Sequence, residues 1–145
     1  MKRIFELVSD DFFTLDKHEI LSTVKASEGR TVMAEVVVAA PPLIYGVSGP
    51  ELAATFGADM ITLNLFDFDN PFIAGIDAID VGNGIGDLLR IESIIRQNRA
   101  NPDYLRNIKK KIGRFIGVNL EPVPETINYP EGRKLSAKNL EKARN

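Results

Sequence analysis

Three runs of apolar, mostly β-branched residues alternate with helical segments, and this alternation limits the fold more than any other feature. The runs span residues 31–39, 60–66 and 115–120. Runs with almost no polar position are typical of strands buried on both faces of a parallel sheet. Parallel strands joined by right-handed helical crossovers give an α/β fold.

Capping signals place helices between these runs. Asp16 with Glu19 three residues later forms a capping box, and Ser48 and Ser136 stand where other helices would begin. We therefore expect an N-terminal helical segment over residues 1–29. The capping signals and apolar periodicity together predict helices near residues 17–28, 50–56, 88–100, 104–112 and 137–145.

Two architectures fit strand–helix units of this kind, an open doubly wound sheet and a (β/α) barrel. The sequence offers three strands in 145 residues, whereas a complete barrel takes about 250 residues. The last predicted helix also begins without a strand after it. We interpret residues 1–145 as a single domain, a partial TIM (β/α) barrel built of parallel strand–helix units.

Composition excludes several classes of partner and site. Eighteen basic and twenty acidic residues leave no charge excess to attract nucleic acid or an anionic membrane. The chain has no cysteine, which excludes disulfides, thiolate metal sites and a cysteine nucleophile. The longest apolar run, residues 36–44, contains two prolines and is too short to cross a bilayer. We expect a cytoplasmic protein without a membrane or nucleic-acid partner.

Polar residues within or just after the predicted strands are the candidates for catalysis, because ligands bind at the carboxyl ends of parallel strands. Glu35 interrupts the first apolar run, and Asn64 and Asn119 stand near the ends of the next two. A buried carboxylate is costly unless it is paired or coordinating. Glu35 is therefore either a functional group or half of a structural ion pair.

Three acidic residues after the strands are candidate metal ligands. Asp67 and Asp69 are two positions apart, so they share a side if the second strand continues, and Glu121 follows the third strand. Carboxylate oxygens are the ligands that Mg²⁺ prefers. The pattern predicts a Mg²⁺ site from Asp67, Asp69 and Glu121, with an Asx turn at the strand end as the alternative.

The segments RTVMAEVVVAAPPLIYGVSGPELAATFGADMITLNLFDFDNP and IGVNLEPVPETINYPEGRKLSAKNLEKA resemble a family of uncharacterised bacterial (β/α)₈-barrel proteins labelled phosphoenolpyruvate phosphonomutase-like. The resemblance covers the amino-terminal part of that family. It implies an enzyme that uses Mg²⁺ to act on a small carboxylate or phosphate compound, by cleavage or rearrangement next to a carboxylate. The lysine- and cysteine-bearing catalytic loop of that superfamily is not found in this chain.

The sequence leaves three functional hypotheses open. The first is the amino-terminal part of a phosphonomutase- or lyase-like barrel enzyme that binds a small anionic ligand. The second is a non-catalytic α/β fragment or binding module that self-associates, because a truncated sheet exposes strand edges and an uncovered apolar face. A third is a complete flavodoxin-like domain. A homo-oligomer is expected for an incomplete barrel.

Overall fold

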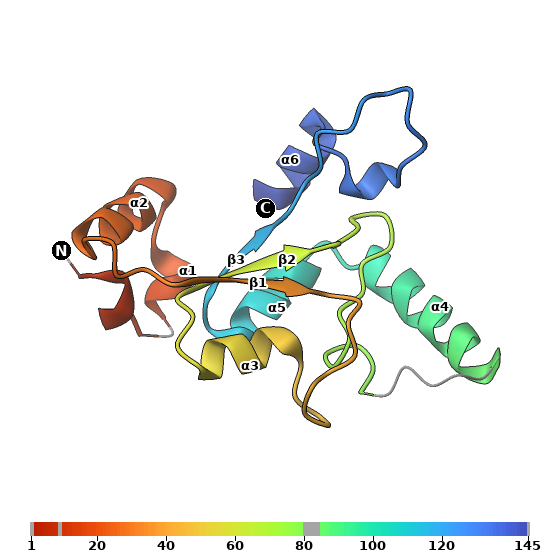
Figure 1. Ribbon diagram of the computed structural model, residues 1–145, viewed down its shortest axis with the longest axis horizontal. Helices are drawn as coiled ribbons and strands as arrows, with labels where there is room; N and C mark the ends of the chain where they lie inside the picture. Colours follow the sequence, from red (N-terminus) through yellow and green to blue (C-terminus); the bar gives the residue numbers. More distant parts are fainter. Residues whose placement is uncertain (1, 9, 80–84, 145) are drawn as a thin grey trace.

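The computed structural model has a small parallel sheet flanked by helices (Figure 1). It describes residues 2–8, 10–79 and 85–144. The expected helices are present close to their predicted positions, with shorter helical turns near both ends of the chain. In chain order the elements are η1 (Ile4–Glu6), α1 (Asp11–Thr14), α2 (Lys17–Ala26), β1 (Met33–Val37), α3 (Gly49–Thr55), β2 (Met60–Asn64), α4 (Ile85–Arg99), α5 (Tyr104–Ile112), β3 (Phe115–Val118), η2 (Glu131–Arg133) and α6 (Ala137–Arg144).

The strands of the sheet lie side by side in the order β1-β2-β3, and both neighbouring pairs are parallel. Met33, Met60 and Phe115 share one level of the register, and each later level advances by one residue on every strand. The predicted α/β class with a parallel sheet is therefore confirmed. Every strand is shorter than its apolar run in the sequence.

One face of the sheet carries the hydrophobic core. Ile61 and Leu63 on β2 are fully buried, and they belong to one cluster with Ile108 and Ile112 on α5. Ala53, on α3, packs against the same cluster. Both helices therefore cover the same face of the sheet. Burying a side chain of this size stabilises the fold by about 1.5–3 kcal/mol, so this face holds the sheet together.

The opposite face is open along β1. Met33 is 64% exposed and Val37 is 42% exposed, whereas Ala34 and Val36 between them are partly buried. The prediction that the strands are buried on both faces is therefore wrong for β1. The reason is that the described helices in contact with β1 and β2 all pack on the core face of the sheet. Strand β1 nevertheless carries apolar residues on both of its faces.

The N-terminal helical segment closes the amino end of the sheet. Ile4 and Phe12 are buried in a second cluster with Phe115, and the rings of Phe12 and Phe115 meet edge to face at 4.8 Å. Met60 packs against this cluster from β2. The backbone N–H of Ile4 donates to the Ser27 hydroxyl at 2.9 Å, which ties the start of the chain to the end of α2.

Helix α3 begins at a capping box that also includes a charge. The Ser48 hydroxyl accepts from the backbone N–H of Glu51, and a carboxylate oxygen of Glu51 accepts from the backbone N–H of Ser48 at 3.1 Å. Lys111 on α5 lies 3.4 Å from the other carboxylate oxygen. Burial by itself would raise the pKa of Glu51, but the hydrogen bonds from Ser48 and the charge of Lys111 hold that pKa below its ordinary value.

We expect Glu51→Gln to lower the free energy of unfolding at neutral pH by roughly 0.3–1 kcal/mol, because glutamine keeps the capping geometry and loses the charge. A depressed native pKa stabilises the fold above the unfolded pKa, and this contribution disappears as pH falls through the native pKa. Urea unfolding of both proteins across acidic pH should therefore converge. Glu125→Gln, at an exposed carboxylate, is the control. A difference that did not change with pH would contradict the charge argument.

Candidate functional site

The open face of the sheet carries a row of polar positions at one level of the register. Glu35 on β1, Thr62 on β2 and Gly117 on β3 are partners across the strands. Glu35 is exposed, and no described residue pairs with its carboxylate. The expectation that Glu35 is buried and needs a partner is therefore wrong, because the carboxylate projects from the uncovered face of an edge strand.

The two asparagines lie one step nearer the carboxyl end. Asn64 pairs with Val37 in the register, and the backbone N–H of Asn119 donates to the Leu63 carbonyl at 3.1 Å. The Asn119 side-chain amide donates to a carboxylate oxygen of Glu121 at 3.2 Å. Period-two alternation thus gives Asn64 the same face as Glu35, and Asn119 continues β3 at the same end of the sheet.

Thr62 is the position on this face that sequence reasoning missed. It stands two residues before Asn64 on β2, and its side chain has no hydrogen bond to the described residues. The signal that could have identified it is the period-two alternation of β2, which places Thr62 with Asn64 on the face opposite the buried Ile61 and Leu63. The site therefore consists of one carboxylate, one hydroxyl and two amides around the bare backbone of Gly117.

The predicted metal ligands Asp67 and Asp69 do not continue a strand. Strand β2 ends at Asn64, and Leu65 adopts a left-handed backbone conformation with φ of 63°. One carboxylate oxygen of Asp67 then accepts from the backbone N–H groups of Asp69 at 2.7 Å and Asn70 at 3.2 Å. Asp67 therefore caps a turn, which was the alternative interpretation of these acids.

The remaining contacts draw the three acids to different partners. Asp69 forms an ion pair with Lys142 of α6 at 3.1 Å, and a carboxylate oxygen of Glu121 accepts a hydrogen bond from the Asn119 side-chain amide at 3.2 Å. Within the described ranges, no group of three or more histidine, cysteine, aspartate or glutamate residues is arranged to hold a metal ion. Asp67, Asp69 and Glu121 therefore do not fit the Mg²⁺ site that the sequence predicts.

A tight contact holds the carboxyl end of β2 against η2. The Phe68 N–H donates to the Gly132 carbonyl at 3.0 Å, and a β-carbon at Gly132 would overlap the Asp67 carboxylate and approach the Asp69 backbone nitrogen to 2.5 Å. The buried Asn139 amide on α6 completes this arrangement by donating to the backbone carbonyls on either side of Gly132, at Glu131 and Lys134. A residue without a side chain is therefore required at 132.

Another buried pair fixes the loop after β2. The Tyr104 hydroxyl donates to an Asp77 carboxylate oxygen at 2.6 Å, and the same oxygen accepts from the Ile73 backbone N–H at 2.6 Å. Burial raises the pKa of Tyr104 far above its usual value, and the hydrogen bond to Asp77 adds to the effect. Tyr104 therefore remains a neutral donor that holds this loop on α5.

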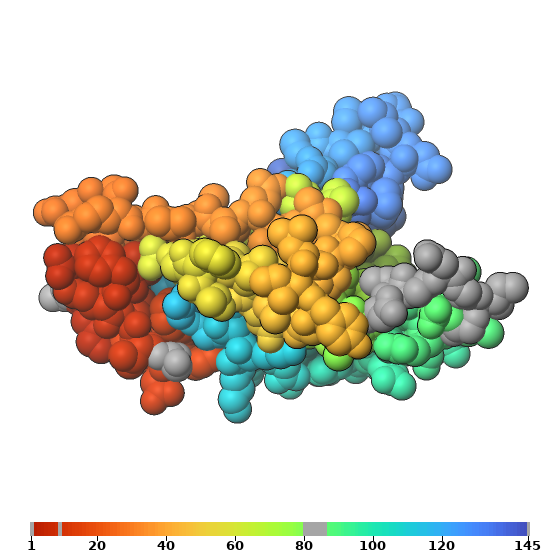
Figure 2. Space-filling model, turned by 60° about the horizontal axis from the view of Figure 1, so that its bottom comes forward, coloured from red at the N-terminus to blue at the C-terminus, as the bar shows by residue number. Residues whose placement is uncertain are grey.

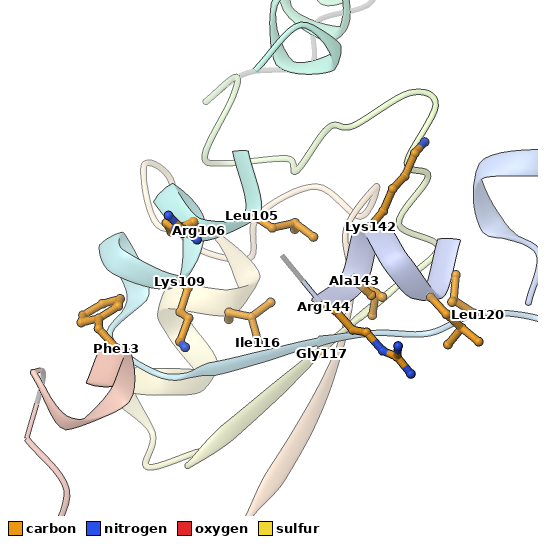
Figure 3. A pocket seen from close by; sticks show the side chains of 12 residues that line it. Phe13, Leu105, Arg106, Lys109, Ile116, Gly117, Leu120, Lys142, Ala143 and Arg144 are labelled. Carbon is orange, nitrogen blue, oxygen red and sulfur yellow. The ribbon is translucent and has the colours of Figure 1, made fainter. Parts of the chain in front are cut away.

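A cleft of about 670 Å³ lies beside β3, between α5 and α6 (Figure 3). Lys109 reaches into it over the rings of Phe13 and Phe115, at 5.6 and 5.5 Å from the ring centroids. Burial lowers the pKa of Lys109, and the nearby charge of Arg106 acts in the same direction. The lining is otherwise apolar or basic and contains no carboxylate: Phe13, Leu105, Arg106, Lys109, Ile116, Gly117, Val118, Leu120, Leu140, Lys142, Ala143 and Arg144.

We expect Gly132→Ala to lower the free energy of unfolding by about 1–3 kcal/mol, the usual effect of overpacking a close contact. The amide hydrogen of Phe68 should exchange faster, because the added methyl group displaces its carbonyl acceptor. Gly117→Ala is the matched control, since its new β-carbon would have Thr62 Oγ1 as its nearest neighbour at 3.7 Å. Unchanged exchange at Phe68 in Gly132→Ala would show that the contact does not hold the loop.

Comparison with known proteins identifies a family without an assigned activity. No described helix is both long and apolar enough to cross a membrane. Neither the curated proteins nor the solved structures contain a match to the chain. A family model described as a domain of unknown function, DUF7916, matches residues 5–145. Since that match covers nearly the whole sequence, the chain belongs to the DUF7916 family.

Proposed function

We propose that the chain is the amino-terminal part of a (β/α)-barrel enzyme and that the open face of its sheet is one wall of the ligand site. The supporting observation is that β1, β2 and β3 follow one another in chain order with α3 and α5 on a single face. In a doubly wound sheet, by contrast, the order reverses and helices cover both faces. Successive winding in one direction is typical of a barrel, in which the uncovered face points inward.

The chemistry of the open face favours a small polar ligand. The amides of Asn64 and Asn119 can donate hydrogen bonds to oxygens of a carboxylate or phosphate group. Glu35 is an exposed carboxylate two levels before Asn64 in the register, and it could accept a proton from a carbon atom of such a compound. A small carboxylate or phosphate compound is accordingly the proposed ligand, in line with the phosphonomutase-like resemblance.

The proposal contains no metal step. The described residues provide no carboxylate cluster for Mg²⁺, so this chain is assigned hydrogen bonding and proton transfer only. A metal in the complete barrel would need ligands other than the trio Asp67, Asp69 and Glu121.

Nuclear magnetic resonance titration of the ¹⁵N-labelled chain with phosphoenolpyruvate, pyruvate and inorganic phosphate tests this proposal. We expect shifts to concentrate at residues 35, 62–64 and 117–119. Asn64→Ala and Asn119→Ala should each weaken binding about fivefold, because one hydrogen bond contributes about 1 kcal/mol. Asn107→Ala, on the exposed side of α5, should leave the dissociation constant unchanged.

Glu35→Gln separates catalysis from binding. If Glu35 transfers a proton, this variant should keep the ligand-induced shifts and lose any exchange of the pyruvate methyl protons with solvent deuterium, followed by ¹H resonance. Shifts confined to the helical lining of the Lys109 cleft, at residues 105–109 and 140–144, would contradict a ligand site on the open face, as would no shifts with any of the three compounds.

A further inference from the structure

The outer edge of β1 has no partner strand among the described residues, although the Val37 carbonyl accepts from the Ala40 N–H at 3.1 Å. The Val38 N–H donates to the Asn64 carbonyl at 3.0 Å, so the even-numbered residues of β1 direct their backbone groups toward β2. Because backbone direction alternates along a parallel strand, the N–H groups of Met33, Glu35 and Val37 point to the other side. No described residue accepts a hydrogen bond from these groups. The strand also contains no lysine or proline, the residues that usually protect an edge.

The outer edge of β3 likewise has no partner strand within residues 2–8, 10–79 and 85–144. Asn119 donates its N–H to β2, so the backbone N–H groups of Ile116 and Val118 point away from the sheet. The cleft between α5 and α6 opens along this edge, with Ile116, Gly117 and Val118 all in its lining (Figure 3). The free edge of β3 therefore lies at the bottom of an apolar and basic groove.

The surface around β1 is apolar, with one acidic residue in the strand. Val32 is 54% exposed beside Met33 and Val37, and the loop after β1 exposes Leu43 almost completely. Figure 2 shows this loop and α3, coloured orange to yellow, standing at the surface. Glu35 is the only charged residue of β1. One free edge is thus apolar and acidic, whereas the other lies in a groove that is apolar and basic.

We propose that β1 of a second copy of this chain adds in parallel to the free edge of β3, in the place that the next strand takes in a complete barrel. The two edges belong to strands that run in the same direction, so a second copy placed beside the first continues the sheet without reversing it. Its helices then lie on the same face as α3 and α5 of the first copy. The shared strand direction and the opposite charges of the two edges favour pairing of β1 with β3. Pairing of β1 with β1 of the other copy has neither advantage.

Gly117 gives this pairing a specific register. If β1 of the partner copy continues the register that joins β1 to β2 and β2 to β3, Glu35 of the partner copy falls beside Gly117. That position has no side chain, and Arg144 lines the same groove. The inference rests on the proposed function in one respect: Glu35 of the partner copy would join Thr62 and Asn119, so two copies would build the ligand site.

Directed cross-linking tests the pairing, because the native chain has no cysteine. Neighbouring strands lie about 4.8 Å apart, within the range of Cα separations that a disulfide spans. Differently tagged Glu35→Cys and Gly117→Cys chains, mixed and oxidised mildly, should form the mixed disulfide in preference to either homodimer. Phe56→Cys, at an 84% exposed position directly after α3, replaces Glu35→Cys as the accessible control and should not cross-link to Gly117→Cys.

Light scattering after size-exclusion chromatography gives an independent measurement. The native chain should show at least twice the mass of one copy, because each pairing of β1 with β3 leaves one further edge of each kind free. Val37→Pro should show a single copy, because proline removes an outward N–H and is tolerated in an edge strand. Val37→Thr is the control and should keep the mass of the native chain. A native chain that stays monomeric, or cysteines that cross-link no faster at 35 than at 56, would overturn the proposal.

These outcomes are separate from those of the ligand titration. Mixed disulfides without ligand-induced shifts would support the pairing and contradict the ligand site. Ligand-induced shifts in a strictly monomeric chain would support the ligand site and contradict its construction from two copies.

Discussion

One-sided burial of the sheet is the constraint on which the rest of the structure depends. Ile61 and Leu63 are fully enclosed because α3 and α5 pack on the same face of the central strand. The same winding leaves the other face of the sheet along β1 without a covering helix from the described part of the chain. Polar side chains are tolerated there because they remain in contact with solvent. They therefore avoid the free-energy cost of burying a polar group without a hydrogen-bond partner. The core therefore determines which side of the sheet can bind a ligand.

Hydrogen bonds, rather than apolar burial, hold the carboxyl end of the sheet in place. Phe68, Gly132 and Asn139 come from three separate segments, and hydrogen bonds to the η2 region join them. This arrangement uses Asp67 and Asp69 as turn and ion-pair residues, which removes them from the set of available metal ligands. Stability at this end and metal binding by these acids are thus competing uses of the same carboxylates.

The sequence predicted the order and type of the main elements, because apolar runs and capping residues act locally. The Ser48 capping box and the helix over residues 104–112 are examples. The ends of the strands were harder to predict from the sequence. The apolar run at residues 60–66 continues through Leu65, but the left-handed backbone of Leu65 ends β2. A leucine rarely adopts that conformation, which costs roughly 1–2 kcal/mol. Only the contacts of the following turn, formed with distant η2, make it favourable.

The candidate site was predicted in part for the same physical reason. Alternation along a strand places Glu35 and Asn64 on one face without any knowledge of tertiary structure. The exposure of Glu35 could not be predicted from the sequence. The same apolar run fits a strand with one covered face and a strand with both faces covered. The sequence did not single out Gly117 as a site residue. Its position became significant only through the strand register, which places it at the same level as Glu35 and Thr62. Glu35 on the free edge of β1 and Gly117 on the free edge of β3 lie at the same level of the register and are complementary in size. Sequence spacing alone does not reveal this match.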